Sequence, residues 1–135
     1  MNKNELVSLA LSARENSYSP YSGFKVGAAL LTKNGKVYKG CNIENGAFSP
    51  TNCAERTAVF TAVADGEKEF EAIAVVGGAD DDEALTKPCI PCGACLQVLA
   101  EFCPPDFPIL LADGVHMLCE FLPKRFGSFD AEEEN

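Results

Sequence analysis

Two short segments carry the most informative pattern in this chain: Cys53-Ala54-Glu55 and Pro91-Cys92-Gly93-Ala94-Cys95. Together they supply three cysteine thiols and one carboxylate. Structural zinc sites usually have four protein ligands, whereas catalytic zinc sites have three and leave the fourth position for water. Three cysteines with a carboxylate nearby therefore match a catalytic zinc site with an open position.

The position of Glu55 suggests a proton-transfer role. Glu55 follows Cys53 by two residues and lies outside the expected ligand set. Because zinc lowers the pKa of its bound water to about 7, a carboxylate at this place can act first as a base and then as an acid. Thr51 and Asn52 favour a helix start just before Cys53, and a proline favours one at Cys92. We expect both halves of the site at helix N-termini, where thiolates are stabilised.

A second cysteine pair overlaps the first, because Pro88-Cys89-Ile90-Pro91-Cys92 also contains a Cys-x-x-Cys spacing. Pro91 would interrupt a helix that began at Cys89. The pair Cys92/Cys95 is therefore favoured over the pair Cys89/Cys92, and the role of Cys89 stays open.

The alternative for the whole cluster is a closed zinc site that only stabilises the fold, which needs a fourth protein ligand. The possible fourth ligands are His116, Cys89, Cys103 and Cys119. Glu55 beside the cysteines favours the catalytic interpretation. The remaining cysteines, Cys41, Cys103 and Cys119, are expected to be small core residues. The start of the chain, residues 1–5, lacks a signal-peptide pattern, so a cytoplasmic protein without a disulfide framework is expected.

Composition and charge limit the range of substrates. The chain has 135 residues, 47% of them hydrophobic, but no apolar stretch near the roughly 18 residues that cross a bilayer. We expect one domain over residues 1–126, an acidic and mobile tail over residues 127–135, and no membrane association. The net charge of −9, with 20 acidic against 11 basic residues, argues against a nucleic-acid-binding surface. An uncharged small molecule is the better substrate.

Hydrophobic periodicity and turn residues predict helices alternating with strands. The predicted helices are 3–16, 53–64 and 92–102, and the predicted strands are 25–32, 36–42, 72–77, 107–112 and 115–121. Asn34-Gly35 and Asp113-Gly114 mark hairpin turns, and the acidic run 80–83 is predicted to be a solvated turn. This order favours an α/β fold with a mixed sheet flanked by helices.

Four sequence blocks, in order, cover most of the chain. They are Tyr18-Ser19-Pro20-Tyr21-Ser22-Gly23-Phe24-Lys25-Val26-Gly27-Ala28-Ala29-Leu30, Asn42-Ile43-Glu44-Asn45, Cys53-Ala54-Glu55-Arg56-Thr57-Ala58 and Pro91-Cys92-Gly93-Ala94-Cys95-Leu96-Gln97. With them the chain resembles the zinc-dependent cytidine deaminases, in particular the small homotetrameric type that acts on free nucleosides. The resemblance implies a three-layer α-β-α fold with a mixed five-stranded sheet, one zinc per chain, and active sites shared between subunits.

The reaction that the resemblance implies is hydrolytic deamination of cytidine, and of 2′-deoxycytidine, in pyrimidine salvage. Zinc-activated hydroxide would attack C4 of the base while Glu55 carries protons. Two alternatives are a deaminase of another cytosine-bearing small molecule, such as a nucleoside antibiotic, and a non-enzymatic zinc-stabilised binding module.

The resemblance also implies residues that bind the nucleoside. Asn42 and Glu44 match residues that hold the ribose hydroxyls, although both could instead belong to a turn at a strand end. Phe24 matches an aromatic residue that packs on the base and the sugar, although it could be an ordinary core residue.

Three further positions follow from the same resemblance. The backbone N–H of Ala54 matches a group that bonds the pyrimidine carbonyl, and the carbonyl of Ile90 would face the departing amino group. Phe126 matches an aromatic residue that closes over the base in a neighbouring subunit, so a monomer would lack a complete pocket.

The neighbours of the ligands differ in part from the family pattern. Arg56 matches a donor to the ligand sulfurs, which offsets the net charge of −1 of Zn²⁺ with three thiolates. Leu96 stands where an arginine usually follows the second cysteine of the pair, so more of that task would fall on Arg56; alternatively, Leu96 simply fills the core. Phe48 stands where the family commonly has tyrosine.

Overall fold

The computed structural model describes residues 1–127 and contains one five-stranded sheet with the strand order β2-β1-β3-β4-β5. The strands are β1 (Lys25–Thr32), β2 (Val37–Cys41), β3 (Phe70–Gly78), β4 (Pro108–Leu111) and β5 (Gly114–Met117). Strand β1 is antiparallel to both β2 and β3, β3 is parallel to β4, and β4 is antiparallel to β5. The predicted mixed five-stranded sheet is confirmed.

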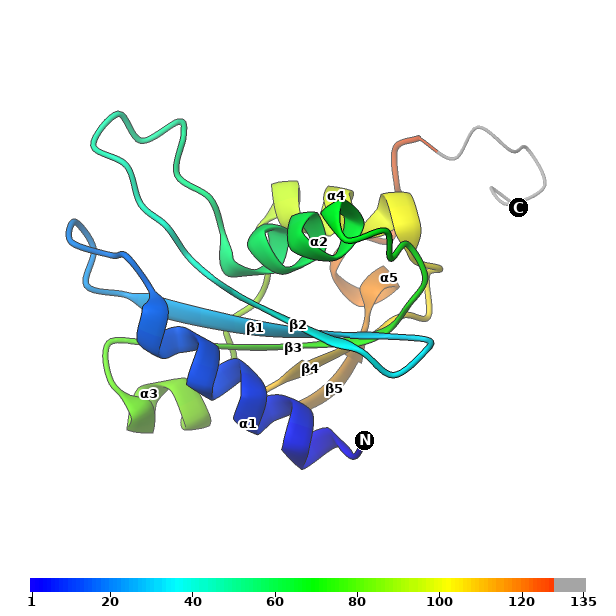
Figure 1. Ribbon diagram of the computed structural model, residues 1–135, viewed down its shortest axis with the longest axis horizontal. Helices are drawn as coiled ribbons and strands as arrows, with labels where there is room; N and C mark the ends of the chain where they lie inside the picture. The colour runs from blue at the N-terminus through cyan, green and yellow to red at the C-terminus, as the bar shows by residue number, and fades with distance from the viewer. Residues whose placement is uncertain (128–135) are drawn as a thin grey trace.

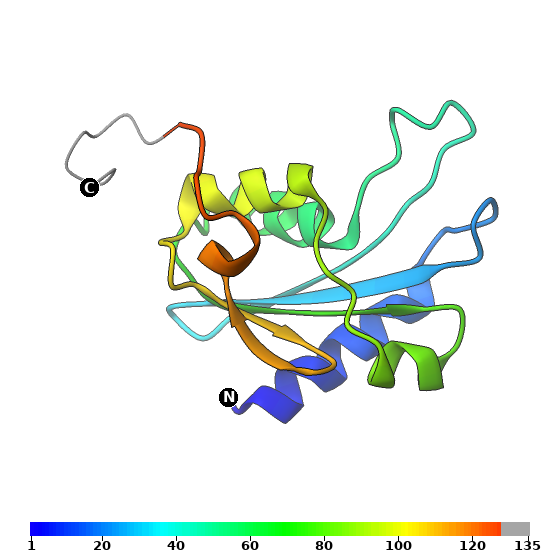
Figure 2. The ribbon, with the colours of Figure 1, turned by 180° about the vertical axis from the view of Figure 1, so that it is seen from behind.

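Helices cover both faces of this sheet (Figures 1 and 2). One face carries α1 (Lys3–Ala13) and α3 (Asp81–Thr86), and the other carries α2 (Ala54–Ala64), α4 (Gly93–Phe102) and α5 (Leu118–Phe121). Each face has its own cluster of buried apolar side chains, a larger one under α2 and α4 and a smaller one under α1. The three-layer α-β-α arrangement is therefore present.

Two glycines allow helices to lie directly on the sheet. A Cβ atom on Gly27 would sit 2.0 Å from the carbonyl oxygen of Ala10 in α1, and one on Gly40 would sit 2.4 Å from the carbonyl oxygen of Ala54 in α2. No larger side chain fits at either contact. Gly40 thus fixes the first turn of α2, where the Cys53 segment begins, close to the edge strand.

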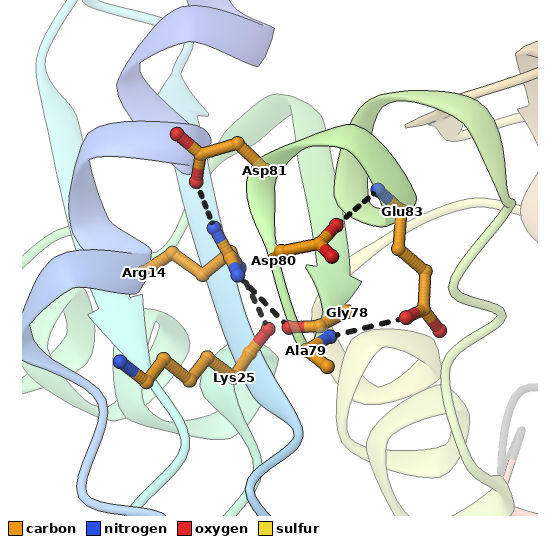
Figure 3. A network of polar contacts seen from close by, with 7 residues as sticks. All are labelled: Arg14, Lys25, Gly78, Ala79, Asp80, Asp81 and Glu83. Atoms are coloured by element: carbon orange, nitrogen blue, oxygen red, sulfur yellow. Dashed lines mark hydrogen bonds and ion pairs between the residues drawn. The ribbon is translucent and has the colours of Figure 1, made fainter.

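Three expectations from sequence were wrong at the level of single elements. The acidic run 80–83 is not a turn, because Asp80 accepts a hydrogen bond from the backbone of Glu83 at 2.8 Å and caps α3 (Figure 3). Acidic side chains stabilise the positive end of a helix, so this run favours a helix start. The tail prediction, residues 127–135, lies outside the described residues except for Gly127. The first helix ends at Ala13 and continues as the 3₁₀ turn η1 (Arg14–Asn16).

The third difference is at the end of the sheet, where the predicted strand 115–121 stops at Met117 and helix α5 follows. The backbone of Leu118 donates to the carbonyl of Phe107, and the carboxylate of Glu120 accepts from the backbone of Met117 at 3.0 Å. These contacts turn the chain out of the sheet, and alternating hydrophobicity alone could not indicate them. Among residues 1–127, no helix has both the length and the apolar character needed to span a bilayer.

Candidate metal and catalytic site

The sulfur atoms of Cys53, Cys92 and Cys95 gather where the N-terminal ends of α2 and α4 lie side by side above the sheet (Figure 1). Cys53 is the N-cap residue of α2, Cys92 is the N-cap residue of α4, and Cys95 lies in the first turn of α4. Both helices therefore point their positive ends at the thiols, as expected from the sequence. The cap itself differs from expectation, because Asn52 donates to Thr57 and Cys53 occupies the cap position.

The spacing of the sulfurs fits zinc. The Sγ atoms of Cys53 and Cys92 are 3.7 Å apart, and those of Cys92 and Cys95 are 3.6 Å apart. A tetrahedral zinc with Zn–S bonds of about 2.3 Å places its sulfurs about 3.8 Å apart. In the part of the chain that the structure describes, this is the one group of three or more His, Cys, Asp or Glu residues that could hold a metal ion. It contains neither Cys89 nor His116.

The lone histidine has other partners. His116 is hydrogen-bonded through its two ring nitrogens to Asp113 at 2.8 Å and to Glu120 at 2.9 Å. Cys103 is 3% exposed and belongs to the apolar core under α4. These two candidates for a fourth ligand are therefore engaged elsewhere, and among the described residues the cluster consists of the three cysteines.

Arg56 supplies positive charge to the cluster. Its Nη2 atom donates to the Sγ atom of Cys53 at 3.3 Å. Bonding to Cys53 raises the pKa of Arg56, so the guanidinium stays charged. Its Nε atom is buried and has no hydrogen-bond partner among the described residues. The pKa of the Cys53 thiol is lowered, first by its bond with Cys95 and then by Arg56, while the pKa of Cys95 is raised by its bond with Cys53 and by burial. The cluster therefore already favours a thiolate at Cys53.

Glu55 lies in the first turn of α2 and is 4% exposed. Burial raises the pKa of Glu55 to about 7. A carboxyl group with a pKa near neutrality can both accept and release a proton, which suits a general acid–base group.

Most of the hydrogen-bonding groups of the Asn42 side chain already have partners within the chain. Its Oδ1 atom accepts from the backbone N–H of Val26 at 2.9 Å and from the hydroxyl of Ser17 at 2.5 Å. Its Nδ2 atom donates to the carbonyl of Phe24 at 2.9 Å. An amide nitrogen has two N–H donors, so one donor of Asn42 remains for a ligand.

Glu44 holds the loop that precedes β1. One of its carboxylate oxygens accepts from the backbone N–H groups of Tyr21 and Ser22, and the other accepts from the hydroxyl of Ser22. The Ser22 hydroxyl bond is the main cause that lowers the pKa of Glu44. Glu44 is therefore an ionised acceptor beside Phe24, whose backbone N–H bonds Ser22 at 3.0 Å.

Cys89 lies close to Phe24 and near enough to Glu55 and Cys53 to be affected by their charges. A Cβ atom on Gly77 would lie 2.7 Å from the Cys89 sulfur and 3.0 Å from the ring of Phe24, so these three residues pack closely together. Burial, and then the charges of Glu55 and Cys53, raise the pKa of Cys89 to about 12. Cys89 is thus a neutral thiol between Phe24 and the cysteine cluster. Sequence analysis did not place it in the site, although the overlapping Cys-x-x-Cys spacing was a signal of its nearness.

The remaining residues predicted for the site are either exposed at the surface or would bind the nucleoside through backbone groups. Ala54 is fully buried as the first residue of α2, where a helix leaves N–H groups without intrahelical partners. Ile90 is 57% exposed just before the α4 segment, and Phe24 is 38% exposed. Phe126 is 77% exposed, and its carbonyl accepts from Gln97 of α4 at 3.1 Å.

Comparison with known proteins gives a consistent result. The family model "Cytidine and deoxycytidylate deaminase zinc-binding region" matches residues 1–111. The chain is 51% identical over 113 residues to a cytidine deaminase of Sporosarcina psychrophila, covering 84% of this chain and 79% of that protein. It is 45% identical to a cytidine deaminase of Halalkalibacterium halodurans over 100% of this chain and 99% of that protein.

A solved structure of a related protein has the same fold. The crystal structure of cytidine deaminase from Burkholderia pseudomallei matches with a TM-score of 0.82 and 45% identity, covering 93% of this chain and 100% of that chain. Since the family model spans the three cysteines and the fold matches over 93% of the chain, the chain belongs to the zinc-binding cytidine and deoxycytidylate deaminases.

Proposed function

We propose that this chain catalyses the hydrolytic deamination of cytidine and 2′-deoxycytidine to uridine and 2′-deoxyuridine, with release of ammonia. Family membership makes it a zinc-dependent deaminase. The observation that carries the proposal is the buried carboxyl of Glu55 beside three sulfurs at zinc spacing.

The three cysteines hold the metal in this proposal. Bound zinc would act as a Lewis acid that brings the pKa of water down to a value near neutrality. The residues of the chain prepare the site for it: the positive ends of α2 and α4 stabilise the thiolates, and Arg56 offsets their charge.

Glu55 is the catalytic residue for proton transfer. With a pKa raised to about 7 by burial, it can take a proton from the attacking water and give it to N3 of the base. It can then take the proton of the new C4 hydroxyl and give it to the departing amine. General acid–base catalysis of this kind contributes about 10²–10⁴-fold in rate.

The nucleoside is held by side chains and backbone groups around this carboxyl. Phe24 packs against the base and sugar, and the free donor of Asn42 and the carboxylate of Glu44 bond the ribose hydroxyls. The Ala54 N–H bonds the pyrimidine carbonyl, and the Ile90 carbonyl accepts from the leaving amino group. A ribose hydroxyl can both donate and accept a hydrogen bond. It therefore suits Asn42, which retains a donor, and Glu44, which is an acceptor.

A homotetramer would complete the pocket, with Phe126 closing over the base in a neighbouring subunit. We also propose a role in pyrimidine salvage in the cytoplasm, where reduced thiols remain available for zinc. The net charge of −9 favours an uncharged nucleoside over a nucleotide or a nucleic acid.

The test is a substrate panel with zinc-quantified protein, followed by the loss of ultraviolet absorbance. Cytidine and 2′-deoxycytidine are expected to turn over, and cytidine 5′-monophosphate and a single-stranded oligonucleotide are not. The panel also includes a cytosine-bearing nucleoside antibiotic. If only this compound is turned over, it is the substrate in place of cytidine. Zinc-loaded protein without turnover of any of these compounds would favour a zinc-stabilised binding module.

A further inference from the structure

Arg14 bonds the last rung of the β1–β3 ladder, outside the residues described above (Figure 3). Lys25 and Gly78 face each other at this end of the two antiparallel strands. The Nε atom of Arg14 donates to the carbonyl of Lys25 at 3.0 Å, and its Nη2 atom donates to the carbonyl of Gly78 at 2.9 Å. One side chain, 5% exposed, thus joins the ends of two strands.

The contacts require the fork of an arginine. A third donor, Nη1, bonds the carboxylate of Asp81 at 2.6 Å. The guanidinium holds its N–H groups in a fixed plane and can satisfy separate acceptors, whereas a lysine ammonium is a single point. The Asp81 side chain is 80% exposed, so its ion pair is screened by water. The two carbonyl contacts, one of them buried, are the tighter constraint.

The backbone of Arg14 is itself fixed against the sheet. A Cβ atom on Gly27 would lie 2.6 Å from the backbone nitrogen of Arg14, so η1 is in direct contact with β1. The guanidinium therefore reaches the strand ends from a short, rigid base on the face that carries α1.

The strand ends that Arg14 holds continue directly into the proposed nucleoside site. Phe24 precedes Lys25, and its carbonyl accepts from Asn42, while the N–H of Val26 donates to Asn42. Three successive residues are thus held by hydrogen bonds: Asn42 bonds residues 24 and 26, and Arg14 bonds residue 25.

The second strand shows the same relation. Gly77 precedes Gly78, and the space above Gly77 is filled by the ring of Phe24 and the sulfur of Cys89. A shift of β3 against β1 at this rung would therefore move the surface on which Phe24 packs.

We infer that Arg14 is a positioning residue for nucleoside binding, which locks the β1–β3 rung so that Phe24 and Asn42 keep their places. This inference rests on the proposed function, because it uses Phe24 and Asn42 as substrate-binding residues. Arg14 acts through the two strands and lies behind the residues that would touch the nucleoside.

The test compares zinc-loaded Arg14→Lys with Asp81→Asn in cytidine deamination. Arg14→Lys keeps the charge but loses the fork, and KM is expected to rise about tenfold with kcat nearly unchanged, because loss of positioned binding contacts affects KM. Asp81→Asn removes the ion pair alone and is expected to leave KM unchanged. Zinc content is expected to stay at one per chain in both.

A matched control separates positioning from general destabilisation. Leu6→Ala removes a buried side chain of α1 on the same face of the sheet without touching the rung. The inference is overturned if Leu6→Ala, compared at equal loss of Tm, raises KM as much as Arg14→Lys does. It is also overturned if Arg14→Lys leaves KM unchanged, or if Arg14→Lys and Arg14→Gln both fail to fold.

A second measurement does not depend on turnover. In ¹H–¹⁵N spectra, Arg14→Lys is expected to shift the backbone signal of Val26 and the side-chain amide of Asn42, and Asp81→Asn is not. Lack of cytidine turnover by the wild-type protein would refute the proposed function, whereas unshifted Val26 and Asn42 signals in Arg14→Lys would refute the role of Arg14.

Discussion

Arg56 illustrates how one side chain beside a metal cluster can control its charge. Its guanidinium is the charged donor to the Cys53 sulfur, and position 96 is a buried leucine that belongs to the apolar core. The sequence predicted the cysteines and Glu55 because their chemistry depends on residue type and short spacing. Arg14 and Cys89 were not predicted, because their roles arise from contacts between segments far apart in the chain.

Replacement of Arg56 is expected to weaken zinc binding more than it affects folding. Arg56→Ala removes the donor to the Cys53 sulfur, and loss of such a partner typically lowers metal affinity about 10–100-fold. Competition with a chromophoric chelator measures this change. Lys68→Ala, which removes an exposed positive charge, serves as the control; an equal loss of affinity there would show that only net charge matters.

At the scale of elements, the order of helices and strands followed from periodicity and turn residues, whereas element ends depended on tertiary contacts. Strand β5 ends early because the backbone of Leu118 bonds the carbonyl of Phe107 and the carboxylate of Glu120 caps the backbone of Met117. The acidic run became a helix because Asp80 caps it. Hairpin turns at Asn34-Gly35 and Asp113-Gly114 were predicted correctly, since their residue types specify the turn locally.

The contact between β2 and α2 makes Gly40 sensitive to substitution. Gly40→Ala would bring a methyl group against the backbone of Ala54 and Ala58, and overpacking of this kind costs about 1–3 kcal/mol. Urea denaturation is expected to show this loss, together with weaker zinc binding, because α2 carries Cys53. The exposed neighbouring change Lys39→Ala is expected to have little effect. Equal stability of both variants would contradict the close contact.

The stabilisation that His116 provides through its bonds to Asp113 and Glu120 is expected to depend on pH. Bonds to Asp113 first, and then to Glu120, raise the pKa of His116. Since the folded-state pKa lies above the unfolded value of about 6.5, the stabilisation is fully present below that value and is lost as pH rises through the folded-state pKa. The difference in Tm between wild type and His116→Gln is therefore expected to shrink from acidic to alkaline pH. A difference that grows with pH would contradict this sign.

At the scale of the whole molecule, the fold matches solved cytidine deaminases, and the proposed homotetramer would complete the proposed pocket. Phe24, Asn42 and Glu44 belong to the proposed nucleoside site, while Phe126, near the C-terminal end of the described residues, is 77% exposed. No pattern within one sequence specifies how copies assemble, and here only the resemblance suggested a tetramer.

Sharing of sites between subunits predicts complementation. Glu55→Gln subunits would lack the proton carrier, and Phe126→Ala subunits would lack the closing ring, so each homo-oligomer is expected to be weak. Mixed oligomers, refolded together, would contain sites with Glu55 from one subunit and Phe126 from another, and are expected to recover activity. Activity equal to the average of the two separate variants would contradict shared sites.

We propose that Glu55 performs proton transfer beside a zinc held by three cysteines, and this role can be tested directly. The most direct measurement is cytidine deamination by wild type and Glu55→Gln, each with its zinc content determined. The account predicts one zinc per chain in both proteins and a loss of turnover of at least about 10²-fold in the variant. Retained turnover in zinc-loaded Glu55→Gln would contradict it.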